Sequence, residues 1–435
     1  MKRLIYIFAL TMLTVMPAKA GFIEELLDFV DAAAMIFNNH ASWNDYYSDS
    51  FIVYYDSYDG QKNKVRLSAK VYYIDNGLDV DRIILACHPT VTDNKETPTG
   101  YKPVDGDVQR MTISYTGGAM VVCPDYCGYG LSSNLQHPYL INDVTARNCI
   151  DAVIAAMGEI TKHGRELDDD YETDIVGYSQ GGATALACTK YLESDACPQD
   201  IKNKIRLAQT SCGDGPYSPV ATVNKYLEWG NPNGDNEDME YACVLPLIVA
   251  AAKDAYGEGC MRTVKIEDFF SDKFNQAGIL NLIKTKSVDT GVLDAEISKA
   301  MNGRKRPVDV FSSNIINADG TFNTKTNEYK CLMRALDMAD LTKGWTPTHP
   351  IFFYHLECDK TVPYANFEEV FKSGHIGDGN SNVRKVNTKK ALDDVAWAVK
   401  WKKDLLDVDL NHISHAAGGV VFYVSYMFSD YVREW

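Results

Sequence analysis

The hexapeptide Gly177–Gly182 (GYSQGG) is the feature that most restricts how this chain can fold. Residues 174–176 (DIV), directly before it, have the pattern of the end of a short strand. The small residues 183–187 after it favour a helix. A serine flanked by glycines at such a strand-to-helix junction sits on a tight turn, where helix and strand must approach closely. We therefore expect Ser179 to be exposed above a sheet, at a helix N-terminus whose amides favour a developing negative charge.

Short apolar runs alternate with segments of helical periodicity along the rest of the chain. A β-hairpin is expected from the tyrosine-rich runs 51–58 and 64–74, which Asp59-Gly60 separates. Further strands are expected at 82–87, 119–123, 173–178, 204–210, 350–356 and 382–386. Helices are expected at 144–160, 180–192, 390–406 and 416–432. This order predicts an α/β fold with right-handed βαβ units and a mostly parallel central sheet flanked by helices.

Residues 214–346 interrupt this alternation with a helical and irregular composition. A structureless connection of that length is implausible within a compact domain. A chain of 435 residues can form two or three domains, or one large α/β domain with an insertion. We expect a largely helical cap or lid at 214–346, over the carboxyl edge of the sheet, between two core parts at 21–213 and 347–435. A separate fused domain is the alternative.

The N-terminus has the features of a cleavable secretory signal peptide over residues 1–20. A basic start is followed by the apolar run 4–16, which is too short to span a bilayer, and then by Ala18-Lys19-Ala20. We expect cleavage after Ala20 and a secreted or periplasmic protein without an integral membrane span; a buried N-terminal helix is the alternative. The formal charge of −16, with no basic run longer than Arg304–Arg306, argues against nucleic acid as a partner.

Eleven cysteines are present, an odd number. Export permits disulfides, and Cys188 with Cys197, or Cys243 with Cys260, are close enough in sequence to pair locally, although spacing does not fix connectivity. Three others are expected to be buried in strands as small apolar side chains: Cys87, Cys123 and Cys212. No cysteine or histidine spacing is typical of zinc, so no metal site and no cofactor are predicted.

A serine nucleophile needs a base that is oriented by an acid, and on this type of turn the chain order is serine, acid, histidine. The acid is expected in the loop after the strand at 350–356, where Asp359 is preferred. Glu357 is the rival acid. The alternative role for Asp359 is to cap the helix that begins near Tyr364.

The base must come later still, which leaves three histidines. His375 lies in a loop directly after the acid's helix, before the last expected strand. His412 and His415 directly precede the final helix. We prefer His415, because the small residues 416–419 after it allow a helix to begin beside the serine turn; His412 remains the alternative base.

Several segments together resemble the α/β-hydrolase superfamily. They are 121–132 (VVCPDYCGYGLS), 137–139 (HPY), the Ser179 turn, 359–364 (DKTVPY) and His415 with the small residues after it. More closely, they are similar to the secretory lipase/esterase branch, which includes Candida lipase A-like enzymes and bacterial relatives. The resemblance implies an α/β-hydrolase fold over most of the chain after residue 60, apart from the cap.

That branch often has His-Gly-Thr after its third strand, where backbone amides help to form an oxyanion hole. This chain has His88-Pro89-Thr90 instead, and proline has no N–H to donate. The donors would then be the Gln180 amide and that of Thr90 or Val91. This departure leaves the composition of the oxyanion hole open.

The pattern as a whole predicts an exported serine hydrolase that cleaves carboxylic esters, either acyl esters or carbohydrate-borne esters. Ser179, His415 and Asp359 would act through an acyl-enzyme intermediate, on a small-molecule ester or lipid. Three alternatives remain: a lipase acting on long-chain acylglycerols, a serine peptidase of the prolyl-oligopeptidase type, and an inactive hydrolase-fold binding protein.

Overall fold

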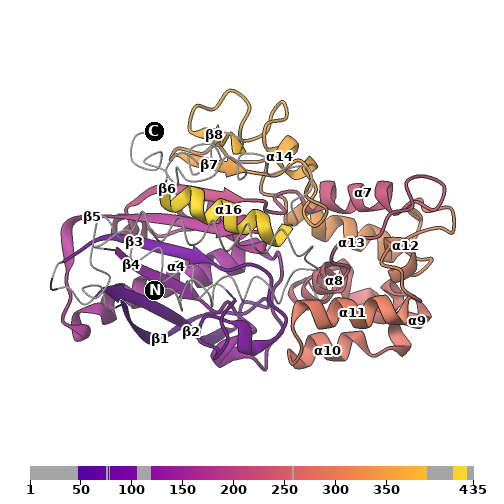
Figure 1. Cartoon of the computed structure of the whole chain (residues 1–435), viewed down its shortest axis with the longest axis horizontal. Coiled ribbons are helices and arrows are strands. Elements are labelled where there is room, and N and C mark those ends of the chain that lie inside the picture. Colours follow the sequence, from indigo (N-terminus) through magenta and orange to yellow (C-terminus); the bar gives the residue numbers. More distant parts are fainter. Residues whose placement is uncertain are drawn as a thin grey trace, which may run out of the picture.

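An eight-stranded sheet forms the centre of the computed structural model (Figure 1). The structure describes residues 48–74, 77, 79–104, 119–256, 259–388 and 415–428. The strands are β1 (Ser48–Tyr58), β2 (Lys64–Ile74), β3 (Val80–Cys87), β4 (Ala119–Pro124), β5 (Leu167–Tyr178), β6 (Leu207–Gly213), β7 (Ile351–Tyr354) and β8 (Val383–Lys385). Their order is β1-β2-β4-β3-β5-β6-β7-β8. Pairing is antiparallel from β1 to β2 and from β2 to β4, and parallel for the other neighbours.

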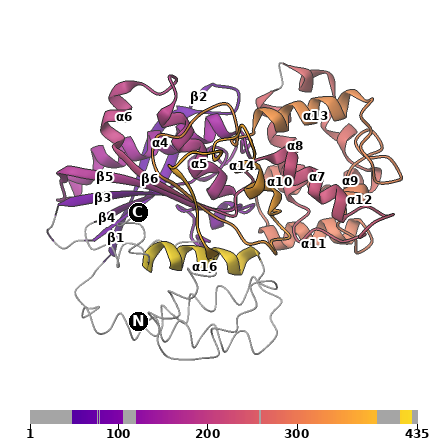
Figure 2. The ribbon, with the colours of Figure 1, turned by 90° about the horizontal axis from the view of Figure 1, so that it is seen from above.

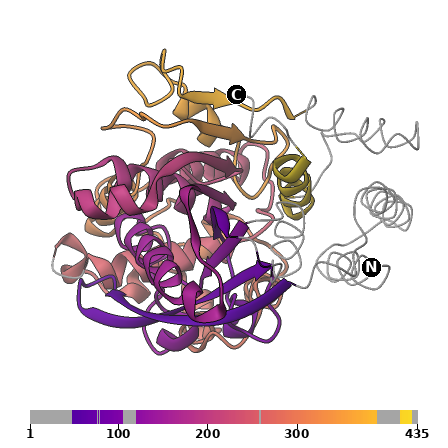
Figure 3. The same cartoon turned by 90° about the vertical axis from the view of Figure 1, so that its left-hand side faces the viewer.

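Helices cover both faces of this sheet. The flanking helices are α4 (Asn142–Glu159), α5 (Gln180–Glu193), α6 (Gln199–Ile205), α14 (Ala365–Val370) and α16 (His415–Phe428). The helices α4 and α5 lie on one face, and α16 lies on the opposite face (Figure 2, Figure 3). The apolar runs of β3 and β4 are buried along almost their whole length between these layers, as expected for strands that are covered on both sides. The predicted α/β-hydrolase fold with its mostly parallel sheet is confirmed.

Between β6 and β7 the chain forms a group of helices at one end of the sheet (Figure 1). These are α7 (Pro219–Trp229), α8 (Val244–Ala255), α9 (Asp272–Gln276), α10 (Ile279–Thr285), α11 (Thr290–Ala300), α12 (Pro307–Val310) and α13 (Asn327–Met338), with the short 3-10 helices η5 (Cys260–Thr263) and η6 (Ile266–Phe269). The apolar α8 is buried, so this inserted group has its own hydrophobic interior. A Cys260–Cys331 disulfide joins η5 to α13.

The starts of two strands need correction. The strand expected at 204–210 begins at Leu207, because Lys204 and Ile205 end α6 and Arg206 terminates that helix in a left-handed conformation (φ 53°). The strand expected at 173–178 begins earlier, at Leu167.

Neither local cysteine pairing occurs, because the partner of Cys260 is Cys331, 71 residues away. Cys188, Cys197 and Cys243 are buried thiols. The expected burial of Cys87, Cys123 and Cys212 is confirmed. The expected signal peptide and the helix expected at 390–406 lie outside the described residues. Every helix that the structure does describe is too short or too polar to cross a bilayer.

Candidate active site

Ser179 occupies the turn between β5 and α5 in a conformation that non-glycine residues rarely adopt. Its backbone has φ 59° and ψ −124°. The Ser179 N–H donates to the carbonyl of Gly213 at the end of the neighbouring strand β6, over 2.9 Å. Such a backbone conformation costs free energy of order 1–3 kcal/mol and is concentrated at functional sites. The turn holds Ser179 directly at the N-terminus of α5, as expected, but the residue is buried (7% exposed) rather than exposed above the sheet.

The glycines around Ser179 are required by close backbone contacts. A Cβ on Gly177 would lie 2.2 Å from the Gly181 carbonyl oxygen, and one on Gly181 would lie 2.0 Å from the Cys87 carbonyl oxygen. Real side chains do not fit at those distances. The absence of both side chains therefore allows the N-terminus of α5 to pack against the end of β3 and the loop that follows it.

His415 and Asp359 form a short, buried pair. His415 Nδ1 lies 2.6 Å from Asp359 Oδ2, and both side chains are almost fully buried. The other carboxylate oxygen of Asp359 accepts the backbone N–H groups of Thr361 (2.7 Å) and Val362 (2.8 Å). With its Nδ1–H donated to the carboxylate, His415 presents Nε2 as the basic nitrogen.

His415 Nε2 is buried and has no hydrogen-bond partner in the described part of the chain. The imidazole lies 5.0 Å, between ring centroids, from the phenol of Tyr178, the residue that precedes Ser179. The structure thus brings the His415–Asp359 pair to the serine turn. It contains no hydrogen bond between His415 Nε2 and Ser179.

The pKa of His415 reflects opposing effects. Burial lowers it, but the charge of Asp359 and the hydrogen bond to it, followed by the charges of Asp214 and Glu240, raise the pKa of His415 to about 9. The surroundings of the imidazole therefore favour its protonated form.

The other candidate acids and bases lie elsewhere. Glu357 is exposed, whereas Asp359 is buried against His415. His375 Nδ1 is 3.1 Å from the hydroxyl of Thr342, away from the serine turn. His412 lies outside the described residues.

The two expected oxyanion donors are Gln180, which begins α5, and Thr90, which lies in the loop after β3. The N-terminus of α5 packs against the start of that loop. Gln180 is the first residue of α5, so its backbone N–H has no partner within the helix. Its side-chain Nε2 donates to His137 Nε2 (2.8 Å), and His137 Nδ1–H donates to the Cys127 carbonyl (2.8 Å). Burial lowers the pKa of His137 to about 3, so this histidine is a neutral support for Gln180. The Thr90 hydroxyl lies 2.9 Å from the hydroxyl of Tyr139.

Sequence reasoning, which selected Asp359 and His415, missed Asp214 beside them and a separate group of three buried thiols. Asp214 lies with Asp359 and His415 in a buried group whose potential ligand atoms are within 4.8 Å of one another. The thiols of Cys87, Cys149 and Cys188 form a second buried group of the same size. Neither group has a recognisable sequence spacing, because its members come from distant parts of the chain. The sequence signal that could have indicated Asp214 is an acidic residue shortly after an apolar strand, the same signal that favours Asp359.

The inserted helices contact the loop that carries Asp359. The Thr361 hydroxyl donates to Glu240 (2.7 Å), and the Lys360 ammonium donates to Glu237 (2.5 Å). The hydroxyl of Tyr226 on α7 donates to the Thr361 carbonyl. The insertion therefore lies against the acid's loop.

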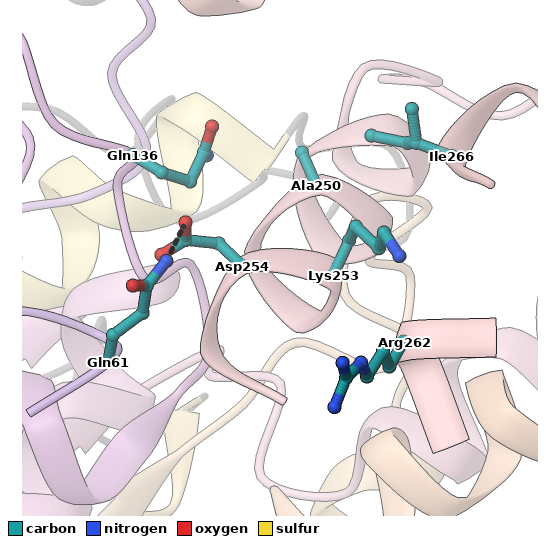
Figure 4. Close-up of a pocket in the computed structure, with 7 residues that line it drawn as sticks. All are labelled: Gln61, Gln136, Ala250, Lys253, Asp254, Arg262 and Ile266. Carbon is teal, nitrogen blue, oxygen red and sulfur yellow. Dashed lines mark hydrogen bonds between the residues drawn. The ribbon is translucent and has the colours of Figure 1, made fainter. Parts of the chain in front are cut away.

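A pocket of about 370 Å³ lies away from these residues (Figure 4). It is lined by Gln61, Gln136, Ala250, Lys253, Asp254, Arg262 and Ile266. The Gln61 side chain donates a hydrogen bond to Asp254 across it (3.0 Å), and the Lys253 ammonium donates to the carbonyls of Met261 and Val264. It contains none of the candidate catalytic residues, so we do not assign the chemistry to it.

Comparison with known proteins identifies the family. The chain's fold is similar to that of the rice cell wall degrading esterase LipA from Xanthomonas oryzae, with 19% identity, 86% of this chain and 94% of that chain covered, and a TM-score of 0.64. It is also similar to Candida antarctica lipase A, with 14% identity, 87% and 86% covered, and a TM-score of 0.52. No curated protein matches the sequence. The model of the secretory lipase family matches residues 106–392, about two thirds of the chain. The chain therefore belongs to the secretory lipase family and is an ester-hydrolysing enzyme.

Proposed function

We propose that this enzyme cleaves carboxylic esters through an acyl-enzyme formed on Ser179. His415 Nε2 accepts the Ser179 proton as Oγ attacks the ester carbonyl carbon, and then gives that proton to the leaving alcohol. Water attacks the acyl-enzyme in the second half, again with His415 as the base. Asp359 holds the imidazole and stabilises its protonated form. The observation that carries this proposal is the buried His415–Asp359 hydrogen bond of 2.6 Å beside the strained Ser179 turn.

The tetrahedral intermediate places a negative charge on the former carbonyl oxygen. We assign its stabilisation to the Gln180 backbone amide and to an amide of the loop after Pro89, with Thr90 preferred. The side-chain bond from Gln180 to the neutral His137 supports this assignment, because it restrains the first turn of α5. The loss of one oxyanion donor typically costs about 3 kcal/mol of transition-state stabilisation.

We assign residues 214–346 as a cap between two core parts, 21–213 and 347–435. Its contacts with the loop of Asp359 support a role in enclosing the acyl or alcohol part of the substrate. A lipase acting on long-chain acylglycerols is the second candidate, and the family to which the chain belongs favours it.

Membership of a secretory family indicates export. We propose that export depends on residues 1–20 as a signal peptide, with cleavage after Ala20. Mass spectrometry of the mature N-terminus is the measurement: Gly21 is expected as the first residue.

The test of the mechanism is Ser179→Ala. We expect hydrolysis of a p-nitrophenyl ester to fall by at least about 10³-fold, because the nucleophile is lost, with the thermal unfolding midpoint unchanged. A fluorophosphonate probe should label the wild type and fail to label this variant. Ser194→Ala, at the other end of the same helix, is the matched control and should retain both activity and labelling. Activity that persists in Ser179→Ala would contradict the proposed nucleophile.

A panel of esters with short to long acyl chains, together with carbohydrate-borne esters, distinguishes the two candidate substrates. The panel includes carbohydrate esters because LipA, with a similar fold, degrades rice cell walls. A preference for short or carbohydrate-borne esters supports an esterase. Activation at an oil–water interface with a preference for long chains supports a lipase.

A further inference from the structure

Tyr178 connects His415 to a second buried carboxyl group. Its phenolic oxygen lies 2.6 Å from Asp214 Oδ2, 2.7 Å from the His415 carbonyl oxygen and 3.5 Å from His415 Nδ1. Asp214 directly follows β6, the strand beside β5 and β7 in the sheet. Carboxylate oxygens of Asp214 and Asp359 and a ring nitrogen of His415 all lie within 4.8 Å of one another. His415 therefore has two carboxyl groups beside it, and the proposed mechanism uses only Asp359.

The position of Asp214 is tightly determined by its surroundings. The side chain is fully buried, and its Oδ1 accepts the backbone N–H of Leu356 (2.9 Å). Its own backbone N–H donates to the Tyr354 carbonyl (3.0 Å). The backbone φ of Asp214 is +36°, in the left-handed region, where a residue other than glycine is strained. The fold thus stabilises an unfavourable backbone conformation that directs this carboxyl group toward Tyr178.

Helix α16 packs closely against Tyr178 and Asp214. A Cβ on Gly418 would lie 2.6 Å from the Tyr178 hydroxyl oxygen and 3.2 Å from Asp214 Oδ2. Glycine at this position lets the first turn of α16, which begins with His415, approach the Asp214–Tyr178 pair. The catalytic histidine and the second carboxyl group are therefore held together by packing as well as by hydrogen bonds.

The protonation state of Asp214 decides where the single Tyr178 proton points. A phenol donates one hydrogen bond at a time. When Asp214 is ionised, Tyr178 donates to its carboxylate. When Asp214 is protonated, the acid can donate to the phenolic oxygen, and Tyr178 can then donate to the His415 carbonyl.

The charges around Asp214 come from several elements. It faces Tyr178 on β5, Tyr354 on β7, His355 and Asp359 after β7, and His415 on α16; His355 Nδ1 is 3.8 Å from Asp214 Oδ1. Burial, with the charge of Asp359, raises the pKa of Asp214 to about 6, against the opposing effects of the two histidines and of the Tyr178 hydrogen bond. Asp214 is thus ionised at neutral and alkaline pH.

We propose that Asp214 is a second acid of this site, a positioning residue that holds Tyr178 against His415 and whose negative charge, with that of Asp359, stabilises the His415 imidazolium directly. The proposal rests on the proposed function, because it assumes that His415 is the base for Ser179. It assigns no contact with substrate to Asp214 or Tyr178. Asp214 acts on the basicity of His415, and the Tyr178 hydroxyl acts on the orientation of His415.

The Asp214→Asn substitution removes the negative charge of this side chain and keeps its capacity for hydrogen bonding. The amide can still accept from Leu356 and donate to Tyr178, as the protonated acid does, but it carries no charge. Because an opposite charge within about 4–6 Å shifts a pKa by one to three units, we expect the acid limb of the kcat/KM profile to move to lower pH by about one unit. The kcat on the plateau should fall with KM unchanged. Asp340→Asn is the matched control, since Asp340 is a buried carboxylate bonded to Ser218 and Thr342 and should leave the profile in place.

Tyr178→Phe provides the second variant, and it keeps the carboxylate. Here we expect kcat to fall by about tenfold through loss of orientation, with KM and the acid limb unchanged. This variant carries the test alone if Asp214→Asn does not fold. An acid limb of Asp214→Asn that superimposes on the wild type would overturn the role of the Asp214 charge, and a wild-type kcat in Tyr178→Phe would overturn the role of the Tyr178 hydroxyl.

The failure of this inference can be distinguished from failure of the proposed function. If Ser179→Ala remains active, or if the fluorophosphonate probe labels another residue, the proposed function fails. If Ser179 is required but Asp214→Asn leaves the acid limb where it is, the second acid alone is rejected.

Discussion

At the scale of single residues, two opposing effects set the pKa of His415: burial lowers it, and the negative charges nearby raise it. Burial removes water from the imidazolium, whereas Asp359 and Asp214 lie close enough to stabilise it. A strong base abstracts a proton from serine more readily, but it must first be deprotonated. With His415 as the proposed base, the pH dependence of ester hydrolysis is expected to report the balance of these two effects.

We expect kcat/KM for a short ester to rise about tenfold per pH unit on the acid side and to level off near pH 9. The sign follows from the raised pKa: below it His415 is protonated and cannot accept the serine proton, and above it the base is free. Rates measured with Ser179→Ala at each pH provide the blank for spontaneous hydrolysis. A plateau that is complete by pH 6 would contradict the stabilisation of the imidazolium by these carboxylates.

The same residues show what sequence reasoning can reach. The sequence favours Asp359 because it lies in a loop just after an expected strand, and the structure places that carboxylate against His415. Asp214 also follows a strand directly, yet its relation to His415 depends on the order of β6 and β7 in the sheet and on the direction of the Tyr178 ring. Those are three-dimensional facts that one sequence does not contain.

At the scale of elements, the site depends on how closely α5 and α16 approach the strand ends. The small residues after His415 predict that a helix can begin beside the serine turn, and the close approach of Gly418 to Tyr178 agrees with that prediction. The strand positions were largely predictable from apolar runs, since buried parallel strands have a strong signal. The start of β6 was not, because a left-handed Arg206 ends α6 without a glycine or proline to mark it.

Gly418→Ala tests the packing of α16. The added methyl group would lie 2.6 Å from both the Tyr178 hydroxyl oxygen and Leu356 Cδ1, so the helix must shift. Overpacking of this kind typically costs about 1–3 kcal/mol of stability, and a displaced His415 should lower kcat as well. Thermal unfolding and ester hydrolysis are the two measurements.

Gly158→Ala is the control for this substitution. Gly158 lies on α4, and a Cβ there would meet no atom within 4 Å. Alanine should therefore stabilise the protein by about 0.5–1 kcal/mol through its better helix propensity, with activity unchanged. Equal stability and activity in Gly418→Ala and Gly158→Ala would show that α16 does not need the close approach.

At the scale of the whole molecule, the inserted helices and the sheet are connected by buried polar contacts. The Lys286 ammonium, after α10, donates to the carbonyls of Ser133 and Leu135 on the sheet side, and burial lowers its pKa to about 8. Thr92, shortly after β3, donates to the Val288 carbonyl (2.8 Å). The helical nature of the insertion was predictable from composition. These contacts of Lys286 and Thr92 were not, because they join residues that are more than 150 positions apart.

The Cys260–Cys331 disulfide lies within the insertion, so its loss should loosen that part more than the sheet. It closes a loop of 71 residues, for which the chain-entropy model gives about 4 kcal/mol of stabilisation. We expect Cys260→Ser combined with Cys331→Ser to lower the thermal unfolding midpoint, and hydrogen exchange to accelerate in η5 and α13 before it does in β5. A reductant should produce the same change in the wild type and none in the double variant, which serves as its own control. A reductant that destabilises both proteins equally would mean that another disulfide links this chain.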